Sequence, residues 1–380
     1  MVVLSTSGIA SIQNRTRPTK CLKGLLYEEM NPACMVEKLD DLPGYSVWDQ
    51  SNMLSQFEGF VIHIKDALGY IAPPFSDVSS ICLCGIGGSA MCGDIMLDYL
   101  APISDMYVSV IRSVSLPKWA NAGTLVVVIS YSGNTKEALD VFHDSLSKGL
   151  RTVCISSGGE LIRKAKEKGV PFIQVPAGIQ PRAALGYLLG SVAVILDSAG
   201  AGSLVRAMND VIPFIRSAQE KLSPSVPVSA NAAKKIALTL NGHVPTVFCP
   251  RSIRSVAVRW QNQINENAKM VAFTGEIPEM NHNQMVAWLS ANGVGKCKPV
   301  FLIPSELEPT VKKMTLVTIQ MFNERGLDPV LVQLDGRSML ENLFYGLVLG
   351  DMVSYYLARL RDVDPTPVDV IAEFKQRISN

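Results

Sequence analysis

The segment TLVVVISYSGNT, residues 124–135, decides the fold class of this 380-residue chain. It opens with a run of apolar, mostly β-branched residues, which is typical of a strand buried on both faces of a parallel sheet. The polar residues SYSGNT then form a turn, and a helical pattern continues through Leu146. The segment ICLCGIGGSA, residues 81–90, has the same arrangement of buried strand, glycine-rich turn and helix. Two such units in succession indicate an α/β fold.

The same alternation continues outward from these two segments. We expect further strands over residues 107–111, 152–156 and 171–175, with helices between them. A helix over 49–68 should precede the first strand, whereas three prolines predict an irregular N-terminal extension over 1–45. Strands that alternate with helices of this length predict a parallel sheet with helices on both faces.

A polar, proline-containing stretch near residues 222–229 marks a boundary, and the alternation restarts after it. The second unit should contain strands over 244–249, 298–303 and 328–333, and helices over 252–269, 309–325, 338–360 and 367–378. We therefore predict two tandem doubly wound domains, each an αβα sandwich with a parallel sheet, over residues 46–222 and 230–380. No strong sequence repeat links the two units, so a duplication at the level of the fold would be invisible here.

The composition excludes several classes of protein. Lys and Arg number 35 and Asp and Glu 34, so a formal charge of +1 gives no general attraction to nucleic acid or to an anionic membrane. The N-terminus lacks the pattern of a signal peptide, and no apolar run is long enough to span a membrane. The 8 cysteines form no paired CxxC units, and the 4 histidines form no HxH or HExxH motif. These patterns predict a cytoplasmic protein with reduced thiols and no metal site.

Two strand-end turns supply candidate groups for binding an anion. Gly87, Gly88 and Ser89 follow the first strand, where glycines let the backbone approach a ligand and the next helix offers free N–H groups. The second turn adds three hydroxyls, those of Ser130, Ser132 and Thr135. Because ligands of open α/β sheets bind at the carboxyl ends of strands, we expect both turns to contact one phosphate group.

Two other interpretations of these turns remain open. A serine in a turn before a helix can simply cap that helix, although a cap needs one hydroxyl and this turn has three. The first turn also fits the GxGxxG/A pattern of dinucleotide-binding proteins. Against that pattern, no acidic residue closes the next strand, MYVSVIR, where a partner for a ribose hydroxyl is expected.

GIGGSA followed by ISYSGNTKEA resembles the sugar isomerase (SIS) domain, a doubly wound fold that binds phosphosugars. Two such domains in tandem characterise the phosphoglucose isomerase superfamily. The second unit contains RWQNQINENAK, residues 259–269, and PEMNHN, residues 278–283. These stretches are similar to those of the archaeal-type bifunctional phosphoglucose/phosphomannose isomerases, as are residues 180–185 and 363–367. The resemblance covers most of residues 45–380.

This resemblance implies an aldose–ketose isomerase that interconverts glucose 6-phosphate and mannose 6-phosphate with fructose 6-phosphate through a cis-enediolate. It assigns proton transfer between C1 and C2 to Glu266, and stabilisation of the enediolate to Arg182, whose charge is permanent. His282, assisted by Lys375, would open the sugar ring. The resemblance also implies a homodimer in which His282 serves the other subunit's site, with no cofactor and no metal. Thr366 would either help the pocket accept both C2 epimers or cap a helix.

Each of these residues also has an ordinary structural interpretation. Arg182 would pair with a carboxylate, and Lys375 would complement a helix dipole. Glu266 and His282 would be solvated surface groups. Three other functions stay open: an isomerase of narrower or different substrate, a non-catalytic phosphosugar sensor, and a nicotinamide-dependent dehydrogenase. A sensor needs the SYSGNT turn but not Glu266 and His282, and the dehydrogenase rests on GIGGSA alone.

Overall fold

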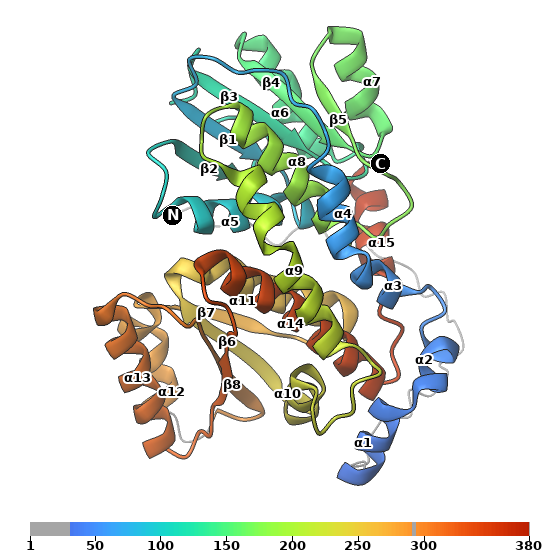
Figure 1. Ribbon diagram of the computed structural model, residues 1–380, viewed down its shortest axis with the longest axis vertical. Helices are drawn as coiled ribbons and strands as arrows, with labels where there is room; N and C mark the ends of the chain where they lie inside the picture. The colour runs from blue at the N-terminus through green and yellow to red at the C-terminus, as the bar shows by residue number, and fades with distance from the viewer. Residues whose placement is uncertain (1–30, 291–293, 380) are drawn as a thin grey trace, which may run out of the picture.

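The chain folds into two parallel sheets, one above the other in the view of Figure 1. The computed structural model describes residues 31–290 and 294–379. Apolar side chains pack on both faces of each sheet, in clusters that include the helices covering those faces. The predicted α/β class, with two doubly wound parallel sheets in tandem, is therefore confirmed.

The first sheet has five strands in the order β2-β1-β3-β4-β5. They are β1 (Ser80–Cys84), β2 (Tyr107–Ile111), β3 (Thr124–Ile129), β4 (Arg151–Ser156) and β5 (Phe172–Gln174). The helices among and after them are α5 (Gly88–Leu100), α6 (Lys136–Ser147), α7 (Gly159–Lys168) and α8 (Leu185–Ser198). Every residue of β1 and β3 is buried, in keeping with their apolar sequences. Because Cys84 pairs with Val128 across these two strands, the turns that follow them leave the same edge of the sheet.

The second sheet has four strands in the order β7-β6-β8-β9. They are β6 (Val244–Pro250), β7 (Phe273–Ile277), β8 (Cys297–Ile303) and β9 (Val330–Gln333). The helices are α10 (Ala232–Leu240), η1 (Arg251–Ile253), α11 (Arg254–Asn267), η2 (Glu279–His282), α12 (Gln284–Ser290), α13 (Pro309–Glu324), α14 (Met339–Leu360) and α15 (Asp369–Ser379). Counted along the chain, the strand order is second, first, third, fourth, as in the first four strands of the first sheet. The two units thus share a topology that their sequences do not reveal.

One apolar core runs through both units. Helix α9 (Leu204–Leu222) leaves the first unit and packs along α14, which also contacts α10 and α11. Residues 342–360 of α14 are all buried, and a helix that is apolar on nearly every side belongs in the centre of a protein. No helix within residues 31–290 and 294–379 is long and apolar enough to cross a membrane.

The prediction of an irregular extension over residues 1–45 is wrong where the structure describes it. Two helices, α1 (Pro32–Asp40) and α2 (Leu42–Trp48), occupy its second part, and residues 1–30 lie outside the described residues. Helix α1 contacts α14, and the Tyr45 ring is buried in the shared core. These helices are therefore part of the folded body.

The prolines of this region begin helices instead of breaking them. Pro32 stands in the first turn of α1, after Asn31, whose side chain caps the helix. Pro43 stands in the first turn of α2, after the capping side chain of Asp41. A backbone N–H in the first turn has no partner within the helix, so proline loses no hydrogen bond there.

Two further details differ from the sequence prediction. The helix expected over 49–68 is two helices, α3 (Met53–Glu58) and α4 (Phe60–Ala67), which meet at Gly59. Strand β7 was not predicted, because its sequence FTGEI has a glycine at its centre and a charge beside it. As the edge strand of the second sheet, β7 leads directly into η2, which carries the predicted ring-opening histidine.

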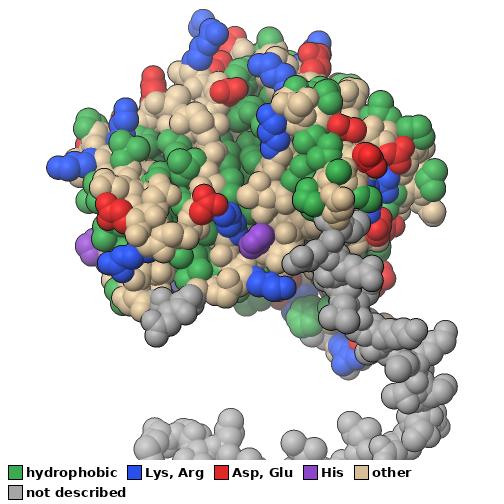
Figure 2. All heavy atoms as spheres, turned by 90° about the horizontal axis from the view of Figure 1, so that it is seen from below, with side chains coloured by type: hydrophobic (Ala, Val, Ile, Leu, Met, Phe, Trp, Pro, Cys, Tyr) green, Lys and Arg blue, Asp and Glu red, His purple; other side chains and the backbone are tan. Residues whose placement is uncertain are grey.

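The surface carries charges of both signs. Figure 2 looks onto the end of the molecule that lies at the bottom of Figure 1. On this face, Lys and Arg side chains are interspersed with Asp and Glu and with apolar side chains. This distribution agrees with the formal charge of +1.

Candidate active site

Two turns at the carboxyl edge of the first sheet form one continuous surface. The glycine-rich turn, residues 85–87, joins β1 to α5, and the hydroxyl-rich turn, residues 130–135, joins β3 to α6. The turns are linked, since the backbone N–H of Tyr131 donates to Ser89 Oγ at 3.2 Å. Each leads into a helix N-terminus, where backbone N–H groups and the helix dipole favour an anion. The structure thus brings the predicted phosphate-binding residues together.

The three hydroxyls of the second turn differ in their surroundings. Ser130 is buried, and its Oγ donates to Thr135 Oγ1 at 3.0 Å and accepts from the backbone N–H of Gly133. Ser132 is exposed, and its Oγ accepts from the backbone N–H of Asn134. Thr135 is the N-cap residue of α6, yet its side chain makes no capping hydrogen bond. Helix capping therefore does not account for these hydroxyls.

Glycines in the first turn let the backbone lie close to its neighbours. At Gly87 φ is +57°, in the left-handed region that favours glycine. A Cβ atom at Gly88 would lie 3.1 Å from the carbonyl O of Pro181 and 3.6 Å from Cα of Arg182. The start of α5 therefore packs directly against the segment that carries Arg182, the predicted catalytic cation.

The guanidinium of Arg182 is buried and held from several sides. Its Nε donates to Asn267 Oδ1 at 2.7 Å, and its Nη2 donates to the carbonyl O atoms of Pro365 and Thr366 at 2.7 and 2.8 Å. Its Nη1 lies 3.6 Å from Glu266 Oε2. Burial lowers the pKa of Arg182, and the negative charge of Glu266 opposes this shift. A fixed positive charge therefore faces the predicted base.

A buried ion pair in the second unit supports this arrangement. Arg259 on α11 donates twice to the carboxylate of Asp351 on α14, at 2.8 and 2.7 Å. Gln263 donates to the same carboxylate at 2.8 Å, and Arg259 also donates to the carbonyl O of Arg182 at 3.1 Å. Burial raises the pKa of Asp351, and the charge of Arg259 is the strongest opposing influence. Helices α11 and α14 thus fix the backbone of Arg182.

Glu266 stands near the end of α11, and its side chain is 33% exposed. Beyond it, Lys269 has a left-handed backbone, and its Nζ donates to the carbonyl O atoms of Glu266 and Pro367 at 2.5 and 2.8 Å. Burial lowers the pKa of Lys269, and the positive charge of Arg182 lowers it further. Lys269 thus ties the end of α11 to residues 365–367. Lys269 closes the stretch RWQNQINENAK, and this position at its end is the one sequence signal for the role.

The structure does not bring the other predicted catalytic residues next to Glu266 and Arg182. His282 is exposed in η2, and among the described residues it forms no hydrogen bond or ion pair with Glu266 or Arg182. Lys375 belongs to α15, but its side chain lies outside the described residues. Thr366 Oγ1 is buried without a hydrogen-bond partner in the part of the chain that the structure describes, so it caps no helix there.

The elements on either side of His282 expose apolar side chains. Phe273 on β7 is 51% exposed and Val286 on α12 is 65% exposed. A groove of about 590 Å³ beside them is lined by Phe273 and Trp288. The edge of the second sheet therefore presents an apolar surface next to the predicted ring-opening residue.

Known proteins resemble this chain in sequence over most of its length. Residues 229–378 match the family described as the bacterial phospho-glucose isomerase C-terminal SIS domain. The chain is 31% identical over 309 residues to the bifunctional phosphoglucose/phosphomannose isomerase of Aquifex aeolicus, which covers 81% of this chain and 93% of that relative. The chain belongs to the bifunctional phosphoglucose/phosphomannose isomerase family.

Two further relatives align with this chain over similar lengths. The enzyme of Thermoplasma acidophilum is 32% identical, over 79% of this chain and 90% of its own. A D-glucosamine-6-phosphate 4-epimerase of Sulfolobus acidocaldarius is 27% identical, over 87% of this chain and 98% of its own.

A solved structure extends the likeness of this isomerase family to the fold. It is the C-terminal domain of glucosamine-fructose-6-phosphate aminotransferase from Francisella tularensis, with a TM-score of 0.66. The sequences are 15% identical, and the match covers 83% of this chain and 98% of that one. At this identity the match shows the fold alone.

Proposed function

We propose that this chain interconverts glucose 6-phosphate and mannose 6-phosphate with fructose 6-phosphate, and that its glucose 6-phosphate reaction serves glycolysis and gluconeogenesis. The observation that carries the proposal is the pairing of Arg182 with Glu266, 3.6 Å apart, beside the glycine-rich turn. An aldose–ketose isomerase needs a base at the reacting carbons and a fixed positive charge for the oxyanion. The names of the relatives support both aldose substrates.

The phosphate group would bind at the two turns of the first sheet. Neither GIGGS nor SYSGNT contains a Lys or Arg, so the protein groups that bind the phosphate there are neutral hydrogen-bond donors. We assign them to the N–H groups of Gly87 and Gly88 at the start of α5, and to the hydroxyls of Ser89, Ser132 and Thr135. The buried hydroxyl of Ser130 would hold the second turn in shape through its contact with Thr135.

Glu266 would take the proton from C2 of the open-chain aldose. The electrons of that C–H bond form a C1–C2 double bond, and the former carbonyl oxygen O1 becomes the anion of a cis-enediolate. Arg182 stabilises this charge without reorganising, because Asn267 and two backbone carbonyls already hold its guanidinium. A proton moves from O2 to O1, and Glu266 returns its proton to C1, which gives the ketose.

The same intermediate accounts for two aldose substrates. The enediolate has no stereocentre at C2, so the glucose and mannose forms lose their difference when Glu266 removes the C2 proton. The pocket therefore has to accept the C2 hydroxyl in both orientations. Thr366 supports this, because its carbonyl O accepts from Arg182 while its buried hydroxyl has no partner among the described residues.

We assign opening of the sugar ring to His282 and Lys375, with His282 supplied by the second subunit of a homodimer. An exposed position beside an apolar sheet edge supports this assignment for His282. A two-fold dimer through that surface would bury Phe273 and Val286 and carry each His282 to the partner's site.

The shared site has a specific test. The variants Glu266→Gln and His282→Ala should each be inactive alone, and mixing them under subunit exchange should restore about a quarter of wild-type activity, since half of the dimers carry one intact site. If each subunit uses its own His282, mixing will restore nothing.

The mechanism itself is tested by Glu266→Gln with both aldose phosphates in an enzyme-coupled assay. We expect kcat to fall roughly 100- to 10,000-fold while phosphosugar binding survives, because the amide cannot accept a proton. Glu324→Gln, on the exposed end of α13, is the matched control and should keep wild-type activity. Full activity of Glu266→Gln would contradict the mechanism.

The alternatives give different results with the wild-type protein. A phosphosugar sensor would bind these hexose phosphates without turning them over. In D₂O the proposed isomerase would incorporate deuterium at C1 or C2, whereas a 4-epimerase would leave both carbons unlabelled. An isomerase of narrower specificity would accept one of the two aldose phosphates alone.

We also propose that the protein works in the cytoplasm. The seven cysteines that lie in the described residues are all free thiols, and most are buried. Burial raises the pKa of Cys154 to about 12, which keeps this thiol protonated and unreactive. A set of buried, unpaired thiols suits a reducing compartment.

A further inference from the structure

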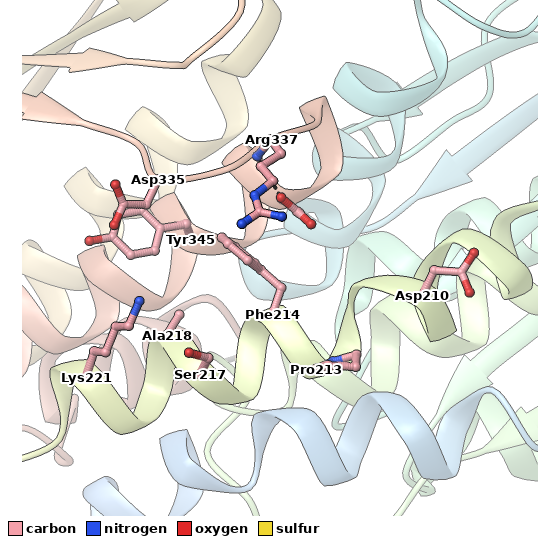
Figure 3. A pocket seen from close by; sticks show the side chains of 10 residues that line it. Asp210, Pro213, Phe214, Ser217, Ala218, Lys221, Asp335, Arg337 and Tyr345 are labelled. Atoms are coloured by element: carbon pink, nitrogen blue, oxygen red, sulfur yellow. Dashed lines mark hydrogen bonds between the residues drawn. The ribbon is translucent and has the colours of Figure 1, made fainter.

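A second cavity lies away from the candidate active site, between α9 and the start of α14 (Figure 3). Its volume is about 480 Å³, within the range of small-molecule sites. None of its lining residues belongs to the phosphate-binding turns or to the network around Arg182. The cavity therefore needs an explanation of its own.

The cavity occupies a place in the fold where ligands commonly bind. Strand β9 ends at Gln333, and the next residues, 334–338, pass along the cavity into α14. Doubly wound sheets bind ligands outside the carboxyl ends of their strands. In the first sheet, the carboxyl ends of the strands carry the two proposed phosphate-binding turns. The cavity lies at the carboxyl end of β9, which is the corresponding edge of the second sheet.

Two cations point into the cavity. Lys221 on α9 and Arg337 before α14 extend toward it from opposite walls, and neither side chain has a hydrogen-bond or ion-pair partner among the described residues. The carboxylate of Glu341 already accepts from the backbone N–H of Arg337, and Asp210 lies 3.9 Å from Arg206. Asp335 lines the cavity as well, so its three carboxylates outnumber its two cations, and an anion is favoured only at the point where the unpartnered side chains of Lys221 and Arg337 face each other near the N-terminus of α14.

The wall between the two cations is aromatic. The rings of Phe214 and Tyr345 have centroids 6.4 Å apart and planes inclined by 60°. Asp335 stands beside Tyr345, and burial together with this carboxylate raises the pKa of the Tyr345 hydroxyl. The rings offer an apolar surface to a planar group, and the Asp335 carboxylate can accept from hydroxyl or amino groups.

We propose that this cavity binds a nucleoside 5′-phosphate. The phosphate lies between Lys221 and Arg337, the base packs against Phe214 and Tyr345, and ribose hydroxyls donate to Asp335. A plain sugar phosphate would satisfy the two cations but would leave the aromatic wall without a planar partner. Because the ligand contacts α9 of the first unit and α14 of the second, its binding stabilises the junction between the units.

Isothermal titration of the full chain tests this site with four probes: AMP, ATP, ribose 5-phosphate and inorganic phosphate. We expect AMP and ATP to bind, and Lys221→Ala and Arg337→Ala each to weaken AMP binding about tenfold or more. Two variants should keep AMP binding: Arg216→Ala, on α9 but outside the cavity, and Ser132→Ala, in the phosphate-binding turn. Circular dichroism checks that each variant is folded.

Several results would overturn the proposal. They are the absence of AMP and ATP binding, unchanged AMP binding in both cation variants, and loss of AMP binding in Ser132→Ala, which would place the nucleotide in the other site. Binding of ribose 5-phosphate or inorganic phosphate as tight as that of AMP would remove the role of the base. These outcomes do not depend on whether the chain is an isomerase.

Discussion

The two sheets have the same strand order but contribute different chemistry. At the carboxyl edge of the first sheet, the turns GIGGS and SYSGNT offer backbone N–H groups and hydroxyls and carry no charged side chain. In the second unit, α11 and α14 supply charged groups, with Glu266 facing Arg182 and Asp351 holding Arg259. The first sheet therefore provides a surface suited to holding a ligand, whereas the charged groups suited to transforming it meet between the units, with Arg182 from the first and Glu266 from the second.

The difference between the neutral turns and the charged groups follows from what each set has to bind. A phosphate brings its own charge, so neutral donors at two helix N-termini are sufficient to hold it. An enediolate acquires its charge only during the reaction, so a cation has to be in place beforehand. Burying Arg182 and Arg259 costs desolvation free energy, which the carboxylate of Asp351 and the surrounding carbonyls offset.

Among the variants that test this comparison, Asp351→Ala should have the largest effect on stability, because it leaves Arg259 buried without its partner. Removing one member of a buried ion pair costs about 3–5 kcal/mol, so the free energy of unfolding should fall by that amount in urea titrations. Asp328→Asn is the control, since it removes an ion pair with Lys298 in which the Asp328 side chain is 90% exposed. Equal midpoints for Asp351→Ala and wild type would show that the ion pair contributes nothing.

Arg182→Lys should be the most damaging change that preserves charge. A lysine cannot reproduce the planar contacts with Asn267, Pro365 and Thr366 at the same time, so its charge would be misplaced. We expect kcat to fall about 100- to 1000-fold with a smaller change in KM. Arg163→Lys, in an exposed cluster on α7, should behave as wild type. A normal kcat for Arg182→Lys would indicate that any positive charge at this position is sufficient to stabilise the enediolate.

The dependence of stability on pH tests the contact that Asp98 makes between the two units. Its carboxylate, on α5 of the first unit, accepts from the backbone N–H of Ser255 on α11 at 2.7 Å. Burial raises the pKa of Asp98 from 3.8 to about 6, against the lowering effects of that hydrogen bond and of Arg251, while Asp94 raises it further.

Because the folded state holds this proton more tightly, Asp98 lowers stability as the pH rises from about 4 to 6. Asp98→Asn cannot ionise, so its stability relative to wild type should increase over this window, by at most about 3 kcal/mol. Urea titrations at pH 4, 5, 6 and 7 measure the difference. Parallel curves for the two proteins would show that Asp98 does not titrate in this range.

Ser132→Ala should have the smallest effect, confined to the first sheet. Loss of one hydroxyl donor to the phosphate should raise KM about tenfold and leave kcat unchanged, because the contact is the same in ground and transition states. Ser147→Ala, at the other end of α6, is the control. A fall in kcat instead would mean that this turn takes part in the chemistry, and that the neutral turns do more than hold the phosphate.

Much of this fold could be predicted from local patterns. Apolar runs such as LVVVIS mark buried parallel strands, and the turns after them mark the ligand-binding edge. The N-terminal helices could not be predicted, because their prolines indicate a helix start only once the capping residue before each is considered. Strand β7 was missed because a glycine stands at its centre and a charged residue beside it, which interrupts the apolar run.

The site was predictable in part. The resemblance named Arg182 and Glu266, but their contact joins distant segments, and no local pattern encodes it. Asp351 was not identified, because a single acidic residue inside an apolar helix has no distinguishing sequence context. The roles of His282 and Lys375 stay predictions, since the first is not joined to the site within one chain and the side chain of the second is outside the described residues.

The buried position of α14 has a consequence for how the chain is made. Helices α1 and α2 are synthesised early, yet Lys38 bonds to Asp362 and the Tyr45 ring lies on Tyr355, 5.9 Å between centroids. A nascent chain that ends before α14 therefore lacks one of the two helices that α1 contacts and the ring that covers Tyr45, and it exposes apolar surface on α9, α10 and α11. Synthesis must almost finish before the body can close, so a ribosome stalled ahead of Met339 would release a target for chaperones.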